Sequence, residues 1–354
     1  MGGLIPASDD QGLGAGYHSP QVDVDVRLNT NESPYPPPPG FLDDLAEAVK
    51  SLPLNRYPDR RATALRGALA GLHGVRPDQV FAGNGSNEVL QTLLSSYGGP
   101  GRTAAVFEPT YALHSHIARL TRTQVAVGER HPDFTLDLGE VKRLLSEARP
   151  AITFLCSPNN PTGGAESAAT VAEVLELTPG IVVIDEAYGQ FAPWSALDLV
   201  TDDLGLAVVR TYSKTWSMAA ARLGYLVGPA PLVAELEQRA LPYHLDAVKQ
   251  AAGRLALEYR AEMEARVALL TAERSRMAEG LAALPVEAWP SDANFILFRP
   301  LAREGSEVWQ ALVDRSVLVR DCSSWARLDG CLRVTVGTRE ENDAFLSALG
   351  EVLL

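Results

Sequence analysis

The sequence has little cysteine and no long hydrophobic run. Its three cysteines, Cys156, Cys322 and Cys331, are too few and too widely spaced for a disulfide framework or for a metal-binding pair at short spacing. No stretch of eighteen uncharged apolar residues occurs, and the first twenty residues lack the apolar core of a signal peptide. We therefore expect a soluble, cytoplasmic protein with no membrane span and no metal site.

Positive charge is also scarce. The chain has 31 lysine and arginine residues against 44 aspartate and glutamate residues, which gives a formal net charge of -13. Because no basic run is present to displace the counterions of a phosphate backbone, nucleic-acid binding is not expected. A small anionic substrate would have to be bound by individual arginines, which makes each arginine position informative.

The chain does contain the apolar residues needed for a large core. At 354 residues and 46% hydrophobic content, it is long enough for two domains. Short apolar runs rich in β-branched residues alternate with segments of helical spacing, and the clearest runs are residues 103–107, 152–156, 181–184, 207–211 and 224–227. Continuous apolar strands indicate a sheet covered on both faces, so we predict an α/β fold with a mainly parallel sheet.

The two ends of the chain differ from this pattern. The proline-rich segment 34–40 cannot form a helix or a central strand, and we interpret residues 1–40 as an extended arm. A long helix is predicted from about Asp246 to about Leu284, followed by strands at 295–298, 317–320 and 332–336. We therefore predict a large domain at 41–245 and a smaller α+β domain at 246–354 that the arm joins.

Polar residues follow several of the predicted strands directly. Asp185 comes after one strand, Ser213 and Lys214 after another, and Asn159 after a third, while residues 83–87 (GNGSN) follow a short apolar run. Ligands of open α/β sheets bind beyond the carboxyl ends of the strands. We expect these residues to meet in one crevice.

This combination of residue types suits pyridoxal 5′-phosphate (PLP). PLP chemistry needs a lysine that forms an imine and an acid that keeps the pyridine nitrogen protonated, and Lys214 and Asp185 could supply them. Asn159 and Tyr188 could bind the phenolic oxygen of the cofactor. Each residue alone has an ordinary structural explanation, such as a helix cap or a surface turn. Their order and strand context together favour the cofactor site.

A phosphate site is also indicated. Residues 83–87 precede the helical pattern at 88–94, so backbone N–H groups and the helix dipole could face an anion. Arg222 could add a bidentate contact.

Longer motifs resemble the fold-type I aminotransferases over nearly the whole chain. The motifs are SPNNPTG at 157–163, DEAY at 185–188, and Ser213-Lys214 with RLGY at 222–225. Within these enzymes the chain resembles the histidinol-phosphate aminotransferase family, on LNTNE at 28–32, RYPD at 56–59, GNGSNE at 83–88 and LRVTVGTREEN at 332–342.

The resemblance implies specific tasks for single residues. It makes Lys214 the Schiff-base lysine, Asp185 the pyridinium partner, and Tyr188 and Asn159 the phenolic-oxygen donors. The remaining cofactor contacts that it implies are Tyr111, Gly85, Ser86, Asn87, Thr211, Ser213 and Arg222, with Tyr57 reaching across from a second subunit of a homodimer. The implied substrate contacts are Arg320 and Arg333 for the phosphate or carboxylate, with Tyr17, Asn31, Asn87 and Tyr243 lining the pocket.

The implied reaction moves an amino group from glutamate to imidazole-acetol phosphate. Residues 215–221 depart from the family pattern, although we interpret Trp216 and Met218 as packing residues. That departure leaves open an aromatic or secondary-pathway amino-acid substrate. A PLP lyase or decarboxylase of a phosphorylated amino acid uses the same fold, and a regulator or scaffold without activity is a third alternative. His114 and His116 have no third ligand nearby in the sequence, so we do not interpret them as a metal pair.

Overall fold

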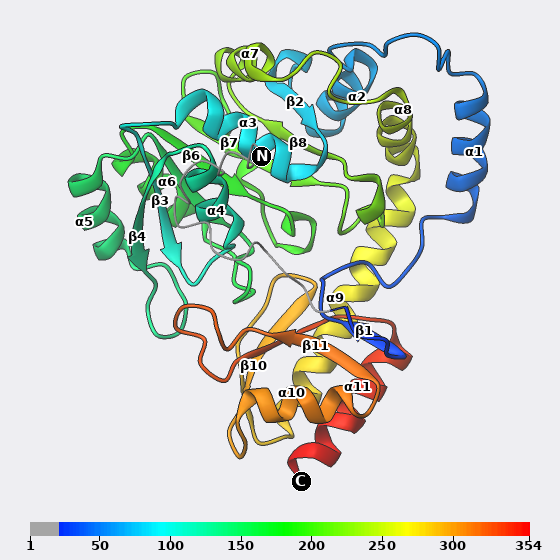
Figure 1. Cartoon of the computed structure of the whole chain (residues 1–354), viewed down its shortest axis with the longest axis vertical. Coiled ribbons are helices and arrows are strands. Elements are labelled where there is room, and N and C mark those ends of the chain that lie inside the picture. The colour runs from blue at the N-terminus through cyan, green and yellow to red at the C-terminus, as the bar shows by residue number, and fades with distance from the viewer. Residues whose placement is uncertain (1–20) are drawn as a thin grey trace, which may run out of the picture.

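The computed structural model describes residues 21–354 and contains two β-sheets, each covered by helices (Figure 1). One sheet has seven strands in the order β2-β8-β7-β6-β5-β3-β4, and the other has five in the order β1-β11-β12-β10-β9. The strands are β1 (Val26–Leu28), β2 (Val80–Gly83), β3 (Thr103–Glu108), β4 (Gln124–Glu129), β5 (Ile152–Cys156), β6 (Ile181–Asp185), β7 (Leu206–Thr211), β8 (Gly224–Val227), β9 (Val286–Ala288), β10 (Phe295–Pro300), β11 (Val317–Asp321) and β12 (Leu332–Thr335).

Helices occupy most of the chain between these strands. The α-helices are α1 (Pro39–Lys50), α2 (Thr63–His73), α3 (Gly85–Tyr97), α4 (Leu113–Leu120), α5 (Leu138–Ala148), α6 (Ala168–Leu177), α7 (Ala230–Arg239), α8 (Ala247–Ala256), α9 (Arg260–Ala282), α10 (Gly305–Val313) and α11 (Arg339–Leu353). Short 3-10 turns lie at η1 (Pro77–Gln79), η2 (Gly189–Phe191), η3 (Ala196–Leu199), η4 (Ala219–Ala221) and η5 (Leu257–Tyr259). None of the helices between residues 21 and 354 is long and apolar enough to cross a membrane.

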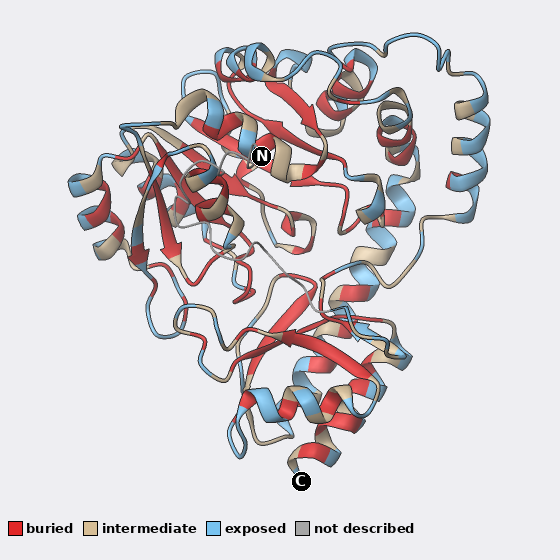
Figure 2. Ribbon diagram, in the orientation of Figure 1, coloured by how far each residue is buried: buried red, intermediate tan, exposed pale blue. Residues whose placement is uncertain are grey.

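The seven-stranded sheet is mainly parallel, as predicted. Strands β4, β3, β5, β6 and β7 pair in parallel, whereas β8 runs antiparallel to both of its neighbours, β7 and the edge strand β2. Every residue of β5, β7 and β8 is buried, and Figure 2 shows the strands as the most buried part of the molecule. The prediction of an α/β fold with a mainly parallel, doubly covered sheet is confirmed.

Alternation along the strands explains how both faces of this sheet are covered. Val106 of β3 packs with apolar residues of α3, α4 and α7, whereas its neighbour Phe107 packs with apolar residues of α5 and α6. Successive side chains of a strand point to opposite faces, so an uninterrupted apolar run supplies two cores at once. The carboxyl ends of the strands are left between these layers, free to carry polar residues.

The five-stranded sheet includes the first described strand of the chain. Strand β1 pairs in parallel with β11, with Val26 opposite Val317 and Leu28 opposite Val319. The core of this sheet combines Phe295 and Phe298 of β10 with apolar residues of α9 and α11. The division of the chain at residues 40 and 245 stays a prediction.

The single long helix predicted from Asp246 to Leu284 is wrong. The turn η5 separates α8 from α9, and Tyr259 at this turn is anchored to α1. Its hydroxyl donates to Asp44 Oδ2 at 2.6 Å, and its ring meets the edge of Phe41 at 5.9 Å. Helix α8 packs on α1 and α2, whereas α9 continues to the five-stranded sheet (Figure 1). Tertiary contacts with α1 therefore interrupt a segment whose own pattern favours one helix.

A buried ion pair joins strand β7 to the segment that follows β6. The Arg210 side chain donates to Glu186 Oε2 through Nε at 2.9 Å and through Nη2 at 2.6 Å, and both side chains are less than a tenth exposed (6% and 3%). Ser195 Oγ and the Ala196 N–H complete the shell of the carboxylate at 2.8 and 2.6 Å. The pair is thus fully hydrogen-bonded, and removing one partner would leave an uncompensated buried charge.

Replacing Arg210 with methionine should therefore destabilise the fold. We expect a loss of about 3–5 kcal/mol in the free energy of unfolding, because Glu186 would stay buried without its counter-charge. Urea denaturation followed by circular dichroism measures the change. Arg143→Met on the surface of α5, which breaks the exposed pairs of Arg143 with Glu140 and Glu147, is the matched control and should leave the midpoint almost unchanged. Equal midpoints for the two variants would contradict this account.

Candidate active site

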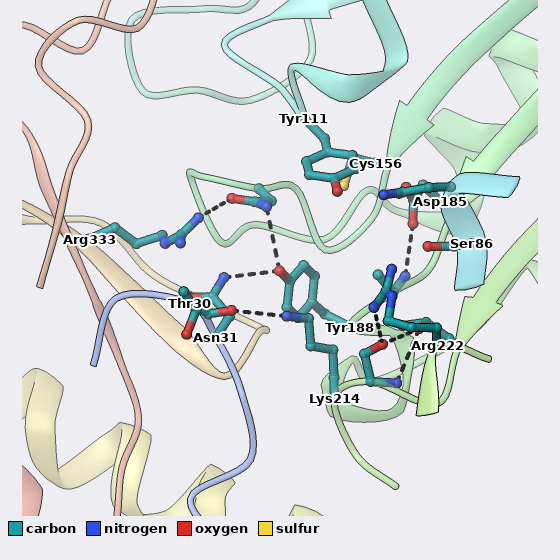
Figure 3. Close-up of a pocket in the computed structure, with 15 residues that line it drawn as sticks. Thr30, Asn31, Ser86, Tyr111, Cys156, Asp185, Tyr188, Lys214, Arg222 and Arg333 are labelled. Carbon is teal, nitrogen blue, oxygen red and sulfur yellow. Dashed lines mark hydrogen bonds between the residues drawn. The ribbon is translucent and has the colours of Figure 1, made fainter. Parts of the chain in front are cut away.

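A pocket of about 640 Å³ lies at the carboxyl ends of the parallel strands. Strand β6 ends at Asp185, and Lys214 follows the end of β7 by three residues. The predicted site residues that line the pocket are Asn31, Ser86, Asn87, Tyr111, Asp185, Tyr188, Thr211, Ser213, Lys214, Arg222 and Arg333. Residues of the N-terminal arm, of both sheets and of the α3 N-terminus thus meet in one place (Figure 3).

The amine of Lys214 points into this pocket. Its Nζ donates to the backbone oxygen of Thr30 at 3.1 Å and lies 5.7 Å from the centre of the Tyr188 ring. Burial, together with the nearby Arg333 guanidinium, lowers the pKa of Lys214 from 10.5 to about 8. About a tenth of this amine is therefore neutral at pH 7, far more than for an ordinary lysine, and able to act as a nucleophile or base.

Asp185 is a buried carboxylate with two hydrogen-bond partners. The side chain is about 2% exposed, its Oδ1 accepts from the Ala187 N–H at 3.1 Å, and its Oδ2 lies 2.9 Å from His114 Nε2. The His114 ring stacks on Phe154 with centroids 4.7 Å apart, which fixes its orientation. A held carboxylate of this kind can stabilise a positive charge in the pocket.

The sequence reasoning missed the contact of His114 with Asp185. His114 lies three residues after Tyr111, and its ring meets the edge of the Tyr111 ring at 5.3 Å. No local pattern in the sequence indicates the contact with Asp185, because the two residues lie 71 positions apart. Among residues 21–354 no group of three or more histidine, cysteine, aspartate or glutamate side chains is placed to bind a metal ion.

Four side chains form a hydrogen-bonded chain across the pocket (Figure 3). Arg333 Nη1 donates to Asn160 Oδ1, and Asn160 Nδ2 lies 3.4 Å from Tyr188 Oη. On the other side, Asn31 Nδ2 donates to Tyr188 Oη at 2.9 Å. Burial raises the pKa of Tyr188 well above its usual value, so this phenol keeps its proton.

The asparagine that reaches the pocket is Asn160, not the predicted Asn159. The amide of Asn159 is fully buried, and its hydrogen bonds go to Pro109 O, Thr162 Oγ1 and Thr110 Oγ1 at 2.9, 2.7 and 2.9 Å. Asn159 is thus engaged in holding the turn, whereas Asn160 lines the pocket. Two adjacent asparagines in one loop cannot be told apart by sequence pattern, because the direction of each side chain depends on the backbone of the turn.

The start of α3 provides an anion-binding end to the pocket. Gly85 begins the helix with φ +79°, and the N-cap Asn84 makes no side-chain cap with the first turn. Arg222 faces this turn and its Nη1 donates to Ser213 Oγ at 3.4 Å. Strand β8 comes so close that a Cβ on Gly224 would lie 2.3 Å from Ser86 N. The uncapped N–H groups and the guanidinium together suit a phosphate.

Two arginines lie side by side on the five-stranded sheet. Arg320 of β11 is directly opposite Arg333 of β12, and both are buried. Arg320 lies over the Trp325 ring at 5.5 Å and Arg333 over the Phe295 ring at 5.1 Å. Like charges opposite each other in a sheet repel, and an anion bound between them would offset that repulsion. Arg320 is not among the residues that line the pocket itself.

Two other predicted residues lie away from the pocket lining. Tyr57 is 80% exposed and stacks on Tyr243 with centroids 4.5 Å apart and rings inclined by 17°. Within a single chain neither ring lines the pocket. Tyr17 lies outside the described residues. The individual tasks assigned to all these residues stay predictions.

Comparison with known proteins identifies a family for this chain. The family described as aminotransferase class I and II matches residues 23–349. A histidinol-phosphate aminotransferase of Frankia casuarinae is 46% identical over 353 residues, covering 95% of this chain and 87% of that protein. Among solved structures, a putative aminotransferase of Burkholderia pseudomallei has a TM-score of 0.84 at 26% identity, covering 94% of this chain and 100% of that one.

A second solved structure carries a ligand. It is the histidinol-phosphate aminotransferase of Sinorhizobium meliloti in complex with pyridoxal 5′-phosphate, with a TM-score of 0.83 at 22% identity, covering 93% of this chain and 91% of that one. At that identity the likeness concerns the fold. The family matches nearly the whole described chain, and the Frankia casuarinae relative is 46% identical over 353 residues. This protein therefore belongs to the aminotransferase class I and II family.

Proposed function

We propose that this protein is a PLP-dependent aminotransferase that moves an amino group between L-glutamate and imidazole-acetol phosphate, forming L-histidinol phosphate for histidine biosynthesis. The observation that carries the proposal is the meeting of the Lys214 amine, the Asp185 carboxylate and the α3 N-terminus in one pocket. The Frankia casuarinae relative bears the name of this activity. We further propose that the protein acts in the cytoplasm as a homodimer.

The residues of the pocket fit PLP. Asp185 and Lys214 offer a carboxylate and an amine to one pocket, Tyr111 offers an aromatic ring, and the first turn of α3 with Arg222 offers a phosphate site. When bound, PLP withdraws electrons from the substrate Cα through its protonated ring. The Asp185 carboxylate would hold the proton on the ring nitrogen, and His114 would keep that carboxylate oriented.

Lys214 has two tasks in this proposal. It would tether the cofactor through its Nζ. Once displaced by the incoming amino group, the free amine would take the proton from the substrate Cα and deliver it to the cofactor carbon that had been joined to Nζ. A pKa of about 8 suits both steps, because the amine can hold or release a proton near neutral pH. Asn160 and Tyr188 would donate to the phenolic oxygen of the cofactor, and Asn160 replaces Asn159 in this task.

The arginine pair would select the substrate. Arg333 donates to Asn160 Oδ1 through Nη1 and to Asn29 O through Nη2, the second at 3.1 Å. These two hydrogen bonds hold the guanidinium at the pocket. Together Arg333 and Arg320 could bind the phosphate of histidinol phosphate, or the carboxylate of glutamate in the other half-reaction, against the negative net charge of the chain. The same pair could accept the carboxylate of an aromatic amino acid, so the assay must compare these substrates.

An exposed apolar surface supports the homodimer. Leu54 and Tyr57 are 68% and 80% exposed, and Leu241 and Tyr243 are 78% and 42% exposed. The Tyr57 and Tyr243 rings stack on each other, so these two form one exposed apolar patch of the kind that a contact surface has. A second copy of the chain seated here would cover this surface and could place Tyr57 of one subunit near the phosphate end of its partner.

A half-reaction assay tests the function. The PLP-loaded protein should convert its cofactor to pyridoxamine phosphate faster with L-histidinol phosphate than with L-phenylalanine or L-tyrosine, as followed by absorbance in a stopped-flow instrument. Lys214→Ala should lose the reaction by roughly 10²–10⁴-fold or more, because the base is removed. Lys142→Ala, on the exposed face of α5, is the matched control and should react like the native protein.

Other results of the half-reaction assay would contradict the proposed function in different ways. Preference for phenylalanine or tyrosine would replace the proposed substrate with an aromatic amino acid. Release of carbon dioxide without pyridoxamine phosphate would indicate a lyase. Full activity of Lys214→Ala would refute the assigned lysine.

The cofactor-free protein should show the lowered pKa of Lys214 directly. Because only the neutral amine is acylated, labelling of Lys214 should reach half of its maximum near pH 8 and level off about one to two pH units higher, whereas an ordinary lysine, with a pKa of about 10.4, keeps gaining reactivity there. Mass spectrometry of the labelled peptides measures this, with a one-lysine peptide as the comparison. A Lys214 profile that matches the free peptide would contradict the pKa shift.

Mixed dimers test the contribution of Tyr57. Lys214→Ala and Tyr57→Ala subunits, each impaired alone, should regain activity when unfolded and refolded together, because a hybrid dimer contains one site with an intact Lys214 and an intact Tyr57 from its partner. Light scattering should give the mass of a dimer. A monomeric protein, or a mixture no more active than its two parts, would oppose the shared site.

A further inference from the structure

Asn31 is the residue at which the N-terminal arm crosses the pocket. It is 1% exposed and has a left-handed backbone with φ +54°. Its backbone is fixed on both sides, since its N–H donates to Thr335 Oγ1 at 3.0 Å and its carbonyl accepts from Asn294 Nδ2 at 3.2 Å. Asparagine tolerates this conformation better than most residues. The arm thus places one amide side chain at a fixed point of the pocket wall.

The orientation of this amide follows from its neighbour Thr335. The Thr335 hydroxyl accepts from the Asn31 N–H, and it is also 3.0 Å from Asn31 Oδ1. A hydroxyl has one proton and two lone pairs, and here it accepts from the Asn31 N–H while its proton goes to Asn31 Oδ1. In this arrangement Asn31 Nδ2 faces Tyr188 Oη, at 2.9 Å, and donates to it. The backbone contacts and the Thr335 hydroxyl together support this orientation of the amide.

The orientation of the Asn160 amide follows from its contact with Arg333. Arg333 can only donate, so the atom of Asn160 beside its guanidinium must be Oδ1. Asn160 Nδ2 then faces Tyr188 Oη at 3.4 Å. Two independent anchors, one on the arm and one on the five-stranded sheet, thus aim N–H groups at one phenolic oxygen (Figure 3).

The hydroxyl of Tyr188 is left with one direction for its proton. A phenolic oxygen has two lone pairs and a single O–H. The amides of Asn31 and Asn160 occupy both lone pairs, and no residue between 21 and 354 accepts a hydrogen bond from Tyr188 Oη. The proton therefore points into the open pocket. A group bound there must offer an acceptor to Tyr188.

We propose that Asn31 is a positioning residue that makes Tyr188 an obligate hydrogen-bond donor toward the phenolic oxygen of PLP. The inference rests on the proposed PLP chemistry, and it gives Asn31 a task that it performs through Tyr188, beyond the substrate contact predicted from sequence. A donated proton stabilises negative charge on the phenolic oxygen, and that charge is greatest when the nitrogen joining Lys214 to the cofactor has lost its proton. Asn31 therefore lowers the pKa of that nitrogen through Tyr188.

The experiment is a double-mutant cycle read by spectroscopy. The visible absorption of the PLP-loaded protein changes with protonation of the nitrogen that joins Lys214 to the cofactor, so a pH titration gives its pKa without any turnover. Asn31→Gly removes the amide but suits a left-handed backbone. We expect Asn31→Gly and Tyr188→Phe each to raise this pKa by about one unit, a roughly tenfold change in the protonation equilibrium. The double variant should shift no further than Tyr188→Phe alone.

Asn31→Asp gives a second, independent variant. A carboxylate at this position accepts from Tyr188 Oη and turns its proton away from the pocket, so the pKa should rise at least as much as with glycine. Thermal unfolding of each variant shows whether the fold is kept.

Two results would overturn the inference. One is an Asn31→Gly shift that persists at full size in the Tyr188→Phe background, and the other is a Tyr188→Phe shift with no Asn31→Gly shift. A native protein that never gains visible absorbance with PLP would instead refute the proposed function itself.

Discussion

The site depends on a carboxylate that is kept out of water at the end of a central strand. Asp185 closes β6, and its side chain is almost fully buried. A buried charge of this kind is costly unless it is hydrogen-bonded, and here each carboxylate oxygen has one partner, the Ala187 N–H for Oδ1 and His114 Nε2 for Oδ2. The fold thus holds one fixed negative charge at the floor of the pocket, and the positive groups Lys214, Arg222 and Arg333 are arranged around the space above it.

The pocket is assembled from parts of the chain that are remote in sequence. The seven-stranded sheet contributes Asp185 and Lys214, the five-stranded sheet contributes Arg333, and the arm contributes Thr30 and Asn31. Hydrogen bonds cross between these parts at Lys214, at Tyr188 and at Asn160. A movement of one sheet against the other would therefore alter the surroundings of the reactive amine.

Sequence reasoning found the parts of the site that follow from strand ends. Lys214 and Asp185 could be placed together because parallel strands deliver their carboxyl ends to one edge, and the anion loop could be recognised because glycines precede a helix. Features that depend on packing could not be found in this way. The break at η5 comes from the contact of Tyr259 with α1, and the choice of Asn160 over Asn159 comes from the geometry of one turn. The contact of His114 with Asp185 joins residues 71 positions apart, which no local pattern reveals.

The pairing of β1 with β11 has a consequence for the order in which the chain can fold during synthesis. The Asp25 N–H donates to Ser316 Oγ at 2.8 Å, a contact that spans 291 residues, and the strand pairing continues from that point. On the ribosome β1 is made before β11, so it must stay unpaired until the 291 residues that separate Asp25 from Ser316 have been made. The parallel sheet can form earlier from contiguous residues, as domains commonly do. Thr30 and Asn31 follow β1 directly, so the wall that the arm contributes to the pocket is completed only when the last strands arrive.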